Sequence, residues 1–315
     1  MDKMVLFSGS SNKKLATKIC KSLNIKLGRA FISRFSDGET RIEIQENVRG
    51  KDVFLIQSTC PPVNDNLVEL LVMLDALRRA SASRITAVIP YYGYARQDRK
   101  DQPRVPITAK LVANLLAEAG ANRGLTLDLH AGQIQGFFDI PLDHLYGINV
   151  FSDYFKKIKL ANLVVVAPDV GAVKMARAYA KRFRGQLAVV DKRRNSPDST
   201  EVMNILGEVK GKNVIMVDDM ISTGSSLVEA AKALKKAGAK KIFAAITHGV
   251  LSNRATEKVE NSDIDSLVIT DSIPVENGKG IKKIKVITVG ELFAEAIRRI
   301  HFEKSISVLF DSIGR

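Results

Sequence analysis

Short apolar runs alternate along the chain with longer stretches in which apolar residues recur every three or four positions. Clear apolar runs lie at residues 53–56, 85–89, 163–166, 214–217, 242–246 and 267–269. Uninterrupted runs of this length are typical of parallel strands that are covered on both faces. The apolar positions from Leu227 to Ala237, just before Gly238, are spaced as on one face of a helix. Strands alternating with helices predict an α/β fold with mainly parallel sheets flanked by helices.

Two segments of the chain are similar to each other. Residues 75–85 read DALRRASASRI and residues 232–242 read KALKKAGAKKI, and Leu-Val-Glu precedes both, at 67–69 and 227–229. Chance similarity between amphipathic helices is the alternative, but the shared order of strand, helix and strand favours two related tandem domains. We expect these domains at residues 1–147 and 148–300. The tail at 301–315 is expected to pack back on the first domain.

The composition favours a globular protein that handles phosphorylated ligands. At 315 residues and 45% hydrophobic, the chain is too apolar for a disordered protein and long enough for two domains. Cys20 and Cys60 are too few for a disulfide scaffold, so a reducing, cytoplasmic setting is expected. No apolar run approaches the roughly 20 residues of a membrane span. The net charge of 48 − 34 = +14 is dispersed along the chain, which favours small phosphorylated ligands over nucleic acid.

The most informative motif is NVIMVDDMISTGSS at residues 213–226. An apolar strand ends in Asp218 and Asp219, and a hydroxyl-rich loop around Gly224 leads into a helix. The N–H groups at a helix N-terminus attract phosphate, and glycine lets the backbone approach it closely. Paired carboxylates can accept hydrogen bonds from a sugar diol or hold a metal. A capped turn beside a helix start is the alternative.

This motif resembles the loop that binds 5-phosphoribosyl diphosphate (PRPP) in proteins of the type I phosphoribosyltransferase fold. The corresponding strand of the first domain ends in Gln57, Ser58 and Thr59 and lacks the motif. We therefore expect the sugar-phosphate site in the second domain alone.

A second cluster of polar residues follows the run LTLDLH at 125–130. Alternation along a strand places Asp128 and His130 on one face, and Asp139 and Asp143 follow a glycine-containing turn. Several carboxylates with a histidine predict a magnesium–phosphate site. A satisfied core histidine is the alternative for His130. The other histidines, His144, His248 and His301, receive that structural interpretation.

The run LDLHAGQIQGFFDIPLDHL at 127–145 resembles the signature of the ribose-phosphate diphosphokinase family, also called PRPP synthetases. Three further motifs agree with this family: FSDGE at 35–39, YYGYARQD at 91–98 and DKRR at 191–194. The resemblance therefore covers nearly the whole chain. It implies two tandem type I phosphoribosyltransferase-like domains. It also implies the transfer of diphosphate from magnesium-bound ATP to the anomeric hydroxyl of ribose 5-phosphate. The products would be PRPP and AMP, which feed nucleotide biosynthesis.

The resemblance also assigns roles to individual residues. ATP would be bound by Phe35, Asp37, Gly38, Glu39, Arg96 and Gln97. Ribose 5-phosphate would be bound by Asp218, Asp219, Ser222, Thr223, Gly224, Ser225 and Ser226. The resemblance adds that His130 would contact Mg²⁺ and the ATP phosphates, and that Asp169, within PDVG at 168–171, would be a metal or ribose ligand. With Asp128, Asp139 and Asp143 of the polar cluster, these residues are the expected Mg²⁺ ligands. Lys192 and Arg194, on a polar segment expected to be mobile, would be the catalytic cations together with His130.

The resemblance further implies an assembly and a form of regulation. In this family Phe35 would stack on adenine across a subunit interface, which implies a homohexamer built from dimers. SISVLF at 305–310 resembles the tail of the class that inorganic phosphate activates and ADP inhibits. Arg49, Ser305 and Ser307 would then be regulatory residues.

Two departures from the family pattern fall in the ribose 5-phosphate loop. Ser222 stands where Asp is common, and Ser226 stands where Thr is common. We expect them to alter substrate binding more than the chemistry. The alternatives are a catalytically silent subunit of a PRPP synthetase, a salvage phosphoribosyltransferase and a PRPP-sensing or nucleic-acid-binding protein. The presence of Asp128, His130, Lys192 and Arg194 argues against the silent subunit.

Overall fold

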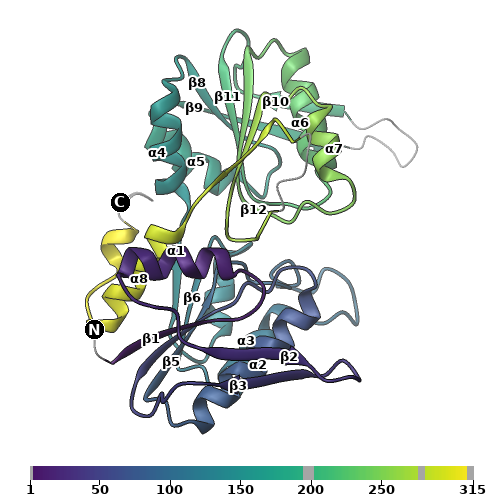
Figure 1. The fold of residues 1–315 in the computed structure, drawn as a ribbon. Coiled ribbons are helices and arrows are strands. Elements are labelled where there is room, and N and C mark those ends of the chain that lie inside the picture. The colour runs from purple at the N-terminus through teal and green to yellow at the C-terminus, as the bar shows by residue number, and fades with distance from the viewer. Residues whose placement is uncertain (1–2, 194–201, 276–280, 311–315) are drawn as a thin grey trace. The chain divides into compact units, whose positions relative to one another are not determined.

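A computed structural model describes residues 3–193, 202–275 and 281–310 of the chain. These residues form two compact units (Figure 1). Unit 1 comprises the described residues within Met1–Tyr146, Ser272–Pro274 and Thr288–Phe310, and unit 2 those within Gly147–Asp271 and Val275–Ile287. None of the helices in the described part of the chain has the length and apolar character needed to span a lipid bilayer.

Unit 1 contains a parallel sheet with the strand order β1-β4-β5-β6-β7 and a separate antiparallel hairpin, β2-β3. The sheet strands are β1 (Met4–Ser8), β4 (Asp52–Ile56), β5 (Arg84–Ile89), β6 (Arg123–Leu127) and β7 (Leu142–Leu145). The hairpin strands are β2 (Ala30–Arg34) and β3 (Thr40–Ile44). The helices are α1 (Lys13–Leu23), α2 (Val63–Arg79), α3 (Thr108–Ala119), α8 (Gly290–His301) and the short 3-10 helices η1 (Gly132–Phe137) and η2 (Ser307–Leu309).

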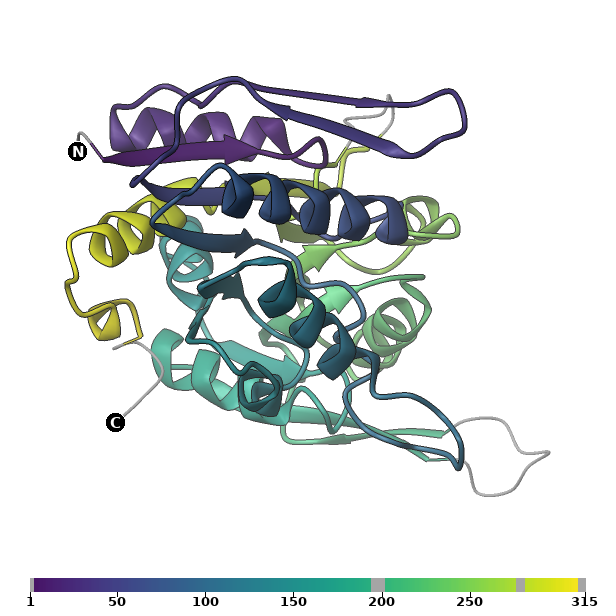
Figure 2. The same cartoon turned by 90° about the horizontal axis from the view of Figure 1, so that it is seen from below.

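The sheet of unit 1 is covered on both faces because its strands are apolar at successive positions. Val5, Phe7 and Leu55 belong to one core cluster with apolar residues of α2 and α3. Leu6 and Phe54, which are fully buried, alternate with them and therefore point to the opposite face. Helix α2 also contacts β3, so the hairpin lies along this helix (Figures 1 and 2).

Unit 2 contains a seven-stranded sheet with the order β10-β9-β8-β11-β12-β13-β14. All its strand pairs are parallel except β9 with β10. The strands are β8 (Leu163–Ala167), β9 (Gln186–Arg193), β10 (Val202–Leu206), β11 (Asn213–Ile221), β12 (Lys241–Gly249), β13 (Ser266–Thr270) and β14 (Ile284–Ile287). The helices are α4 (Ile148–Ile158), α5 (Val173–Phe183), α6 (Ser225–Lys236) and α7 (Ala255–Glu260). The predicted α/β fold with mainly parallel sheets flanked by helices is thus confirmed.

The two similar sequence segments occupy corresponding positions in their units. Residues 75–85 span the end of α2 and the start of β5, which pairs in parallel with β4. Residues 232–242 span the end of α6 and the start of β12, which pairs in parallel with β11. The predicted helical stripe forms the buried face of α6, where Leu227, Ala231 and Leu234 pack into the core of unit 2.

The expected limit of the second domain at residue 300 differs from the structure. After β14 the chain returns to unit 1, where α8 packs against α1. Arg84 Nη2 donates to the carbonyl oxygen of Ile300 at 3.0 Å, and His301 Nδ1 lies 2.7 Å from Asp52 Oδ2. The apolar periodicity of α8 predicts that one face of this helix is buried, but it does not predict which unit covers that face.

Candidate active site

The motif at 213–226 forms a loop at the carboxyl end of β11 in unit 2. Asp218 and Asp219 are the last acidic residues of this strand, and α6 begins four residues after its end, at Ser225. Gly224 adopts φ 74°, a left-handed conformation that glycine accepts without steric cost. Because Gly224 has no side chain, it cannot cap the first N–H groups of α6. The first N–H groups of α6 therefore receive no hydrogen bond from a capping side chain.

A third carboxylate lies at the same edge of the sheet. Strands β8 and β11 are parallel neighbours, with Val166 opposite Met216, so the loop after β8 and the end of β11 share one edge. This loop carries Asp169, whose Oδ1 accepts the N–H of Ala172 at 3.1 Å. Ligands of open α/β sheets bind at such carboxyl edges.

The three carboxylates create a negative site. Burial raises the pKa of Asp218 well above its ordinary value, and the charges of Asp219 and Asp169 raise it further. The N–H of Asp219 donates to Asp218 Oδ1 at 2.9 Å, which offsets a part of this rise in pKa. A site of this kind favours a cation or the hydroxyl donors of a sugar.

Two hydroxyls of the loop are held by the segment that follows β12. Ser222 Oγ lies 3.0 Å from Ser252 Oγ, and the N–H of Ser252 donates to the carbonyl oxygen of Ser222 at 3.0 Å. Lys258 Nζ, on α7, donates to Ser225 Oγ at 2.8 Å. Neither Ser252 nor Lys258 could be assigned to the loop from the sequence, because each lies about 30 residues further along the chain.

In unit 1, FSDGE forms the turn that joins β2 to β3. The N–H of Phe35 donates to the carbonyl oxygen of Glu39 at 2.8 Å, and the N–H of Glu39 donates to Asp37 Oδ1 at 3.1 Å. Gly38 adopts φ 95°. The Phe35 ring is 49% exposed and lies beside the guanidinium of Arg41, whose Cζ is 5.5 Å from the ring centroid. The turn thus presents an aromatic ring to solvent, where a flat ligand could stack on it.

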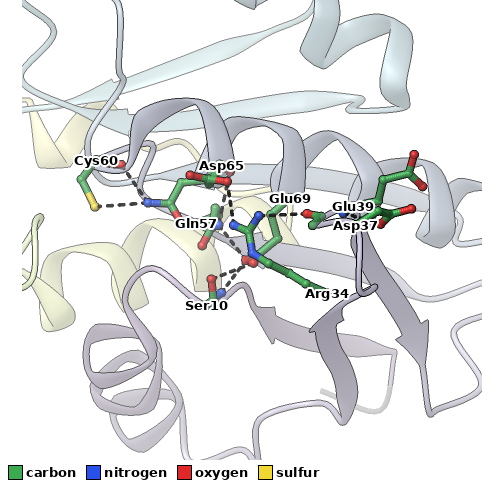
Figure 3. A network of polar contacts seen from close by, with 10 residues as sticks. Ser10, Arg34, Asp37, Glu39, Gln57, Cys60, Asp65 and Glu69 are labelled. Atoms are coloured by element: carbon green, nitrogen blue, oxygen red, sulfur yellow. Dashed lines mark hydrogen bonds and ion pairs between the residues drawn. The ribbon is translucent and has the colours of Figure 1, made fainter.

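One arginine holds this turn against α2, as Figure 3 shows. Arg34 Nη1 donates to the carbonyl oxygen of Gly38 at 3.1 Å, and Arg34 Nη2 donates to Asp65 Oδ1 at 2.7 Å. Neither Arg34 nor Asp65 was singled out from the sequence. The contact depends on how the hairpin lies along α2, which local sequence does not encode.

Arg96 and Gln97 lie in the segment after β5 and are both exposed. Gln97 is held by the N–H of Ala109, which bonds to its carbonyl oxygen, and by the hydroxyl of Thr108. Asp98 Oδ2 accepts from Gln133 Nε2 at 2.8 Å, so this segment is tied to η1, which follows β6. The structure therefore brings two of the predicted motifs of unit 1 together.

The predicted four-residue magnesium cluster is not formed. Strand β6 ends at Leu127, and Asp128 has φ 33°, so the strand alternation stops before His130. Asp128 is buried whereas His130 is exposed. Asp139 Oδ2 pairs with Lys110 Nζ at 3.0 Å, and Asp143 Oδ2 pairs with Arg123 Nη1 at 2.6 Å. Within residues 3–193, 202–275 and 281–310, no three His, Cys, Asp or Glu side chains are arranged to hold a metal ion.

The proposed catalytic cations can be placed only in part. Lys192 belongs to β9 and pairs with Met203 of β10, but its side chain lies outside the described residues. Arg194 lies outside them entirely. Their catalytic role stays a prediction.

The proposed regulatory residues lie on two segments of unit 1. The N–H of Arg49 donates to Asn47 Oδ1 at 3.0 Å. Ser305 Oγ and Ser307 Oγ are 2.7 Å apart, and Arg299 Nη1 donates to the carbonyl oxygen of Ser305 at 2.9 Å. The ring of Phe310 packs edge-on against Tyr146, with 6.2 Å between ring centroids. Residues 301–310 thus contact unit 1, while 311–315 lie outside the described residues.

The parallel sheet of unit 2, with paired carboxylates at a strand end and a glycine-containing loop at a helix N-terminus, defines an α/β protein of the phosphoribosyltransferase-like class. Residues 4–120 match a family model described as the N-terminal domain of ribose phosphate pyrophosphokinase. Residues 192–311 match the phosphoribosyl synthetase-associated domain.

Similar proteins cover the chain almost completely. The ribose-phosphate pyrophosphokinase of Rhizobium meliloti is 56% identical over 310 residues, 98% of this chain and 100% of the relative. That of Campylobacter jejuni is 54% identical over 305 residues, 97% of this chain and 98% of the relative. A crystal structure of phosphoribosylpyrophosphate synthetase from Mycobacterium smegmatis superposes with a TM-score of 0.90 at 38% identity, covering 96% of this chain and 99% of that one. The chain belongs to the ribose-phosphate pyrophosphokinase family, which confirms the resemblance.

Proposed function

We propose that this chain is a ribose-phosphate pyrophosphokinase, an enzyme that transfers the diphosphate group of ATP to ribose 5-phosphate and so supplies nucleotide biosynthesis. The anomeric oxygen of ribose 5-phosphate attacks the β-phosphorus of ATP and loses its proton. The bond from the β-phosphorus to the oxygen of the α-phosphate breaks, which leaves PRPP and AMP. The observation that carries the proposal is a family match along nearly the whole chain that includes the Asp218–Asp219 loop.

The loop of unit 2 is proposed to bind ribose 5-phosphate. The N–H groups at the start of α6 and the hydroxyls of residues 222–226 suit the 5-phosphate. Asp218 and Asp219 can accept hydrogen bonds from the ribose hydroxyls, and neutral hydroxyl donors relieve the like-charge contact between these carboxylates.

Elements of unit 1 are proposed to bind ATP. Phe35 offers an exposed ring for adenine, and the turn that carries it also presents Asp37, Gly38 and Glu39. Arg96 and Gln97 are exposed next to Asp98, which is hydrogen-bonded to Gln133. The guanidinium of Arg96 and the amide of Gln97 are groups that suit a nucleotide. Phe35 is exposed on a hairpin, which supports the proposal that a second copy of the chain completes the adenine site. Such a contact would occur in a homohexamer built from dimers.

Mg²⁺ is proposed to bind at two places. Asp128 and His130 follow β6 in unit 1, and Asp169 follows β8 in unit 2. Asp139 and Asp143 pair with Lys110 and Arg123. In proteins Mg²⁺ is usually bound by one or two carboxylates and completes its coordination shell with phosphate oxygens and water. The small number of carboxylates at each place agrees with this preference. When bound, Mg²⁺ neutralises charge on the phosphoryl oxygens of ATP. His130, Lys192 and Arg194 are proposed to stabilise the remaining charge that develops during transfer.

The test is to incubate the purified chain with ribose 5-phosphate and magnesium ATP and to follow the products by ³¹P NMR. Equal amounts of PRPP and AMP are expected, with a strong loss in Lys192→Ala. Absence of PRPP from a folded, assembled protein would refute the activity and favour the silent subunit. Titration with inorganic phosphate tests the proposed activation, which a flat response would remove.

A further inference from the structure

Helix α7 is fixed directly against the loop at the start of α6. A Cβ atom added to Gly224 would lie 3.6 Å from the Cβ of Ala255, the first residue of α7. The N–H of Leu251 donates to the carbonyl oxygen of Ile221 at 3.1 Å, and the N–H of Ser252 donates to that of Ser222. The segment from 250 to the start of α7 therefore follows the loop closely, and side chains of α7 can reach it.

Lys258 uses this position to reach the loop. Its Nζ donates to Ser225 Oγ at 2.8 Å across 33 residues of sequence. The neighbouring acid on the helix, Glu257, is already engaged, because Arg254 donates to both of its oxygens at 2.6 and 2.7 Å. Among the residues that the structure describes, the Lys258 ammonium contacts a neutral hydroxyl and no carboxylate lies within 4.0 Å of it. Its charge is therefore not neutralised within the described chain.

The loop lacks a cation of its own. Residues 222–226 supply only hydroxyl and N–H donors, which are neutral, whereas the phosphate of a sugar phosphate is a dianion. Asp169, Asp218 and Asp219 stand at the same edge of the sheet and would repel that charge. A nearby ammonium offsets the repulsion, and a charge-assisted hydrogen bond is stronger than a neutral one.

We propose that Lys258 is a binding residue for the 5-phosphate of ribose 5-phosphate, an inference that rests on the proposed function of the loop. The hydroxyl of Ser225 accepts a hydrogen bond from Lys258, so its own proton is free to be donated to a phosphate oxygen. The ammonium adds a positive charge beside that phosphate. Lys258 thereby favours phosphorylated pentoses over unphosphorylated ones.

The experiment compares Lys258→Gln and Lys258→Arg with the wild type in steady-state assays of PRPP formation. In Lys258→Gln we expect the KM for ribose 5-phosphate to rise about tenfold, the factor that matches the loss of one charge-assisted hydrogen bond. The kcat and the KM for ATP should stay within about twofold, since the proposed role confines Lys258 to the 5-phosphate of the sugar. Lys258→Arg should restore most of the affinity.

Lys236→Gln is the matched control, because it removes the same charge from the opposite end of α6. Its kinetic constants should equal those of the wild type. Added KCl should raise the KM for ribose 5-phosphate more steeply in the wild type than in Lys258→Gln, because salt screens the contact between an exposed lysine and a phosphate. A merely structural role of Lys258 would not change the salt dependence.

The outcomes separate this inference from the proposed function. If the wild type makes PRPP and Lys258→Gln keeps its KM for ribose 5-phosphate, or loses kcat alone, the inference is overturned and the function stands. If the wild type makes no PRPP, the function fails, and calorimetric titration of both proteins with ribose 5-phosphate decides the inference. Weaker binding in Lys258→Gln would then support it, and equal or absent binding would overturn it.

Discussion

At the scale of single residues, Asp218 is held in a position that disfavours its charge. Burial and the charges of Asp219 and Asp169 raise its pKa, so its ionised form is disfavoured in the folded chain without ligand. The N–H of Asp219 is its backbone donor, at 2.9 Å. An asparagine could accept the same hydrogen bond and would carry no charge. The like-charge contact therefore lowers the stability of the free protein, which agrees with the ligand-binding role proposed for Asp218.

Asp218→Asn should consequently stabilise the free protein and weaken substrate binding. We expect Tm in the presence of EDTA to rise by about 2 °C, since a like-charge contact is removed. The KM for ribose 5-phosphate should rise at least tenfold, the scale of a lost charge-assisted hydrogen bond. Differential scanning calorimetry and steady-state assays measure the two effects. Asp153→Asn, on the exposed face of α4, is the charge-matched control. A lower Tm in Asp218→Asn would contradict this account.

The residues that sequence reasoning found are those whose chemistry is local. The sequence identifies Asp218, Asp219 and Gly224 because a strand, a turn and a helix start follow one another within 14 residues. Lys258 and Ser252 could not be found in this way, because they reach the loop through the packing of α7. The strand alternation through His130 failed because Asp128 leaves the extended conformation, and residue type alone does not encode that local change.

At the scale of elements, the hairpin β2–β3 depends on a contact with α2. Arg34 joins the turn at Gly38 to Asp65 with two hydrogen bonds (Figure 3). Both side chains are about half exposed, at 52% and 43%, so the ion pair should add little to the free energy of unfolding. Its effect is to fix where the turn presents Phe35 and Glu39.

Arg34→Gln should therefore impair ATP binding without unfolding the protein. We expect the KM for ATP to rise about threefold to tenfold and Tm to change by less than about 1 °C, because an exposed ion pair contributes at most about 1 kcal/mol to folding. Ribose 5-phosphate binding should be unchanged. Arg79→Gln, which breaks the exposed pair with Asp75 on the same helix, controls for charge. An unchanged KM for ATP would show that Arg34 does not position the turn.

The sequence predicted which segments form helices and strands better than it predicted which elements pack against each other. Apolar runs identified the parallel strands, and one stripe identified the buried face of α6. The unit that α8 covers was not predictable, because an amphipathic helix specifies a buried face and not the surface that buries it. That choice is made by the fit of α8 on α1 and by the contacts of Arg84 and His301.

At the scale of the whole chain, the loop proposed to bind ribose 5-phosphate lies in unit 2, after β11. In unit 1, strand β4 is followed by Gln57, whose Oε1 accepts from Ser11 Oγ at 2.6 Å. The buried Glu69 carboxylate accepts the N–H of Ser10 at 2.6 Å and Gln57 Nε2 at 2.8 Å (Figure 3). Side chains of unit 1 thus accept from the donors of the loop after β1, whereas β11 of unit 2 carries two adjacent carboxyl groups, Asp218 and Asp219, near its end.

The chain should accordingly bind one ribose 5-phosphate. Isothermal titration calorimetry is expected to give a stoichiometry of one per chain, because the loop after β4 in unit 1 has no paired carboxylates and its hydroxyls are engaged within that unit. Ser58 Oγ donates to the carbonyl oxygen of Ser272 at 2.5 Å, and Thr59 Oγ1 donates to that of Tyr91 at 3.0 Å. Asp219→Asn should weaken this single event strongly. A second, equally tight site that survives Asp219→Asn would show that unit 1 has kept a sugar-phosphate site after all.

The most direct test of the central claim follows the phosphorus atoms of ATP into the products. ATP labelled with ³²P at the α, β or γ position is incubated with the enzyme, Mg²⁺ and ribose 5-phosphate, and the products are separated. The account predicts that the β and γ labels both appear in PRPP and that the α label appears in AMP. Transfer of the γ label alone, with ADP as the other product, would contradict it, because attack would then occur at the γ-phosphorus.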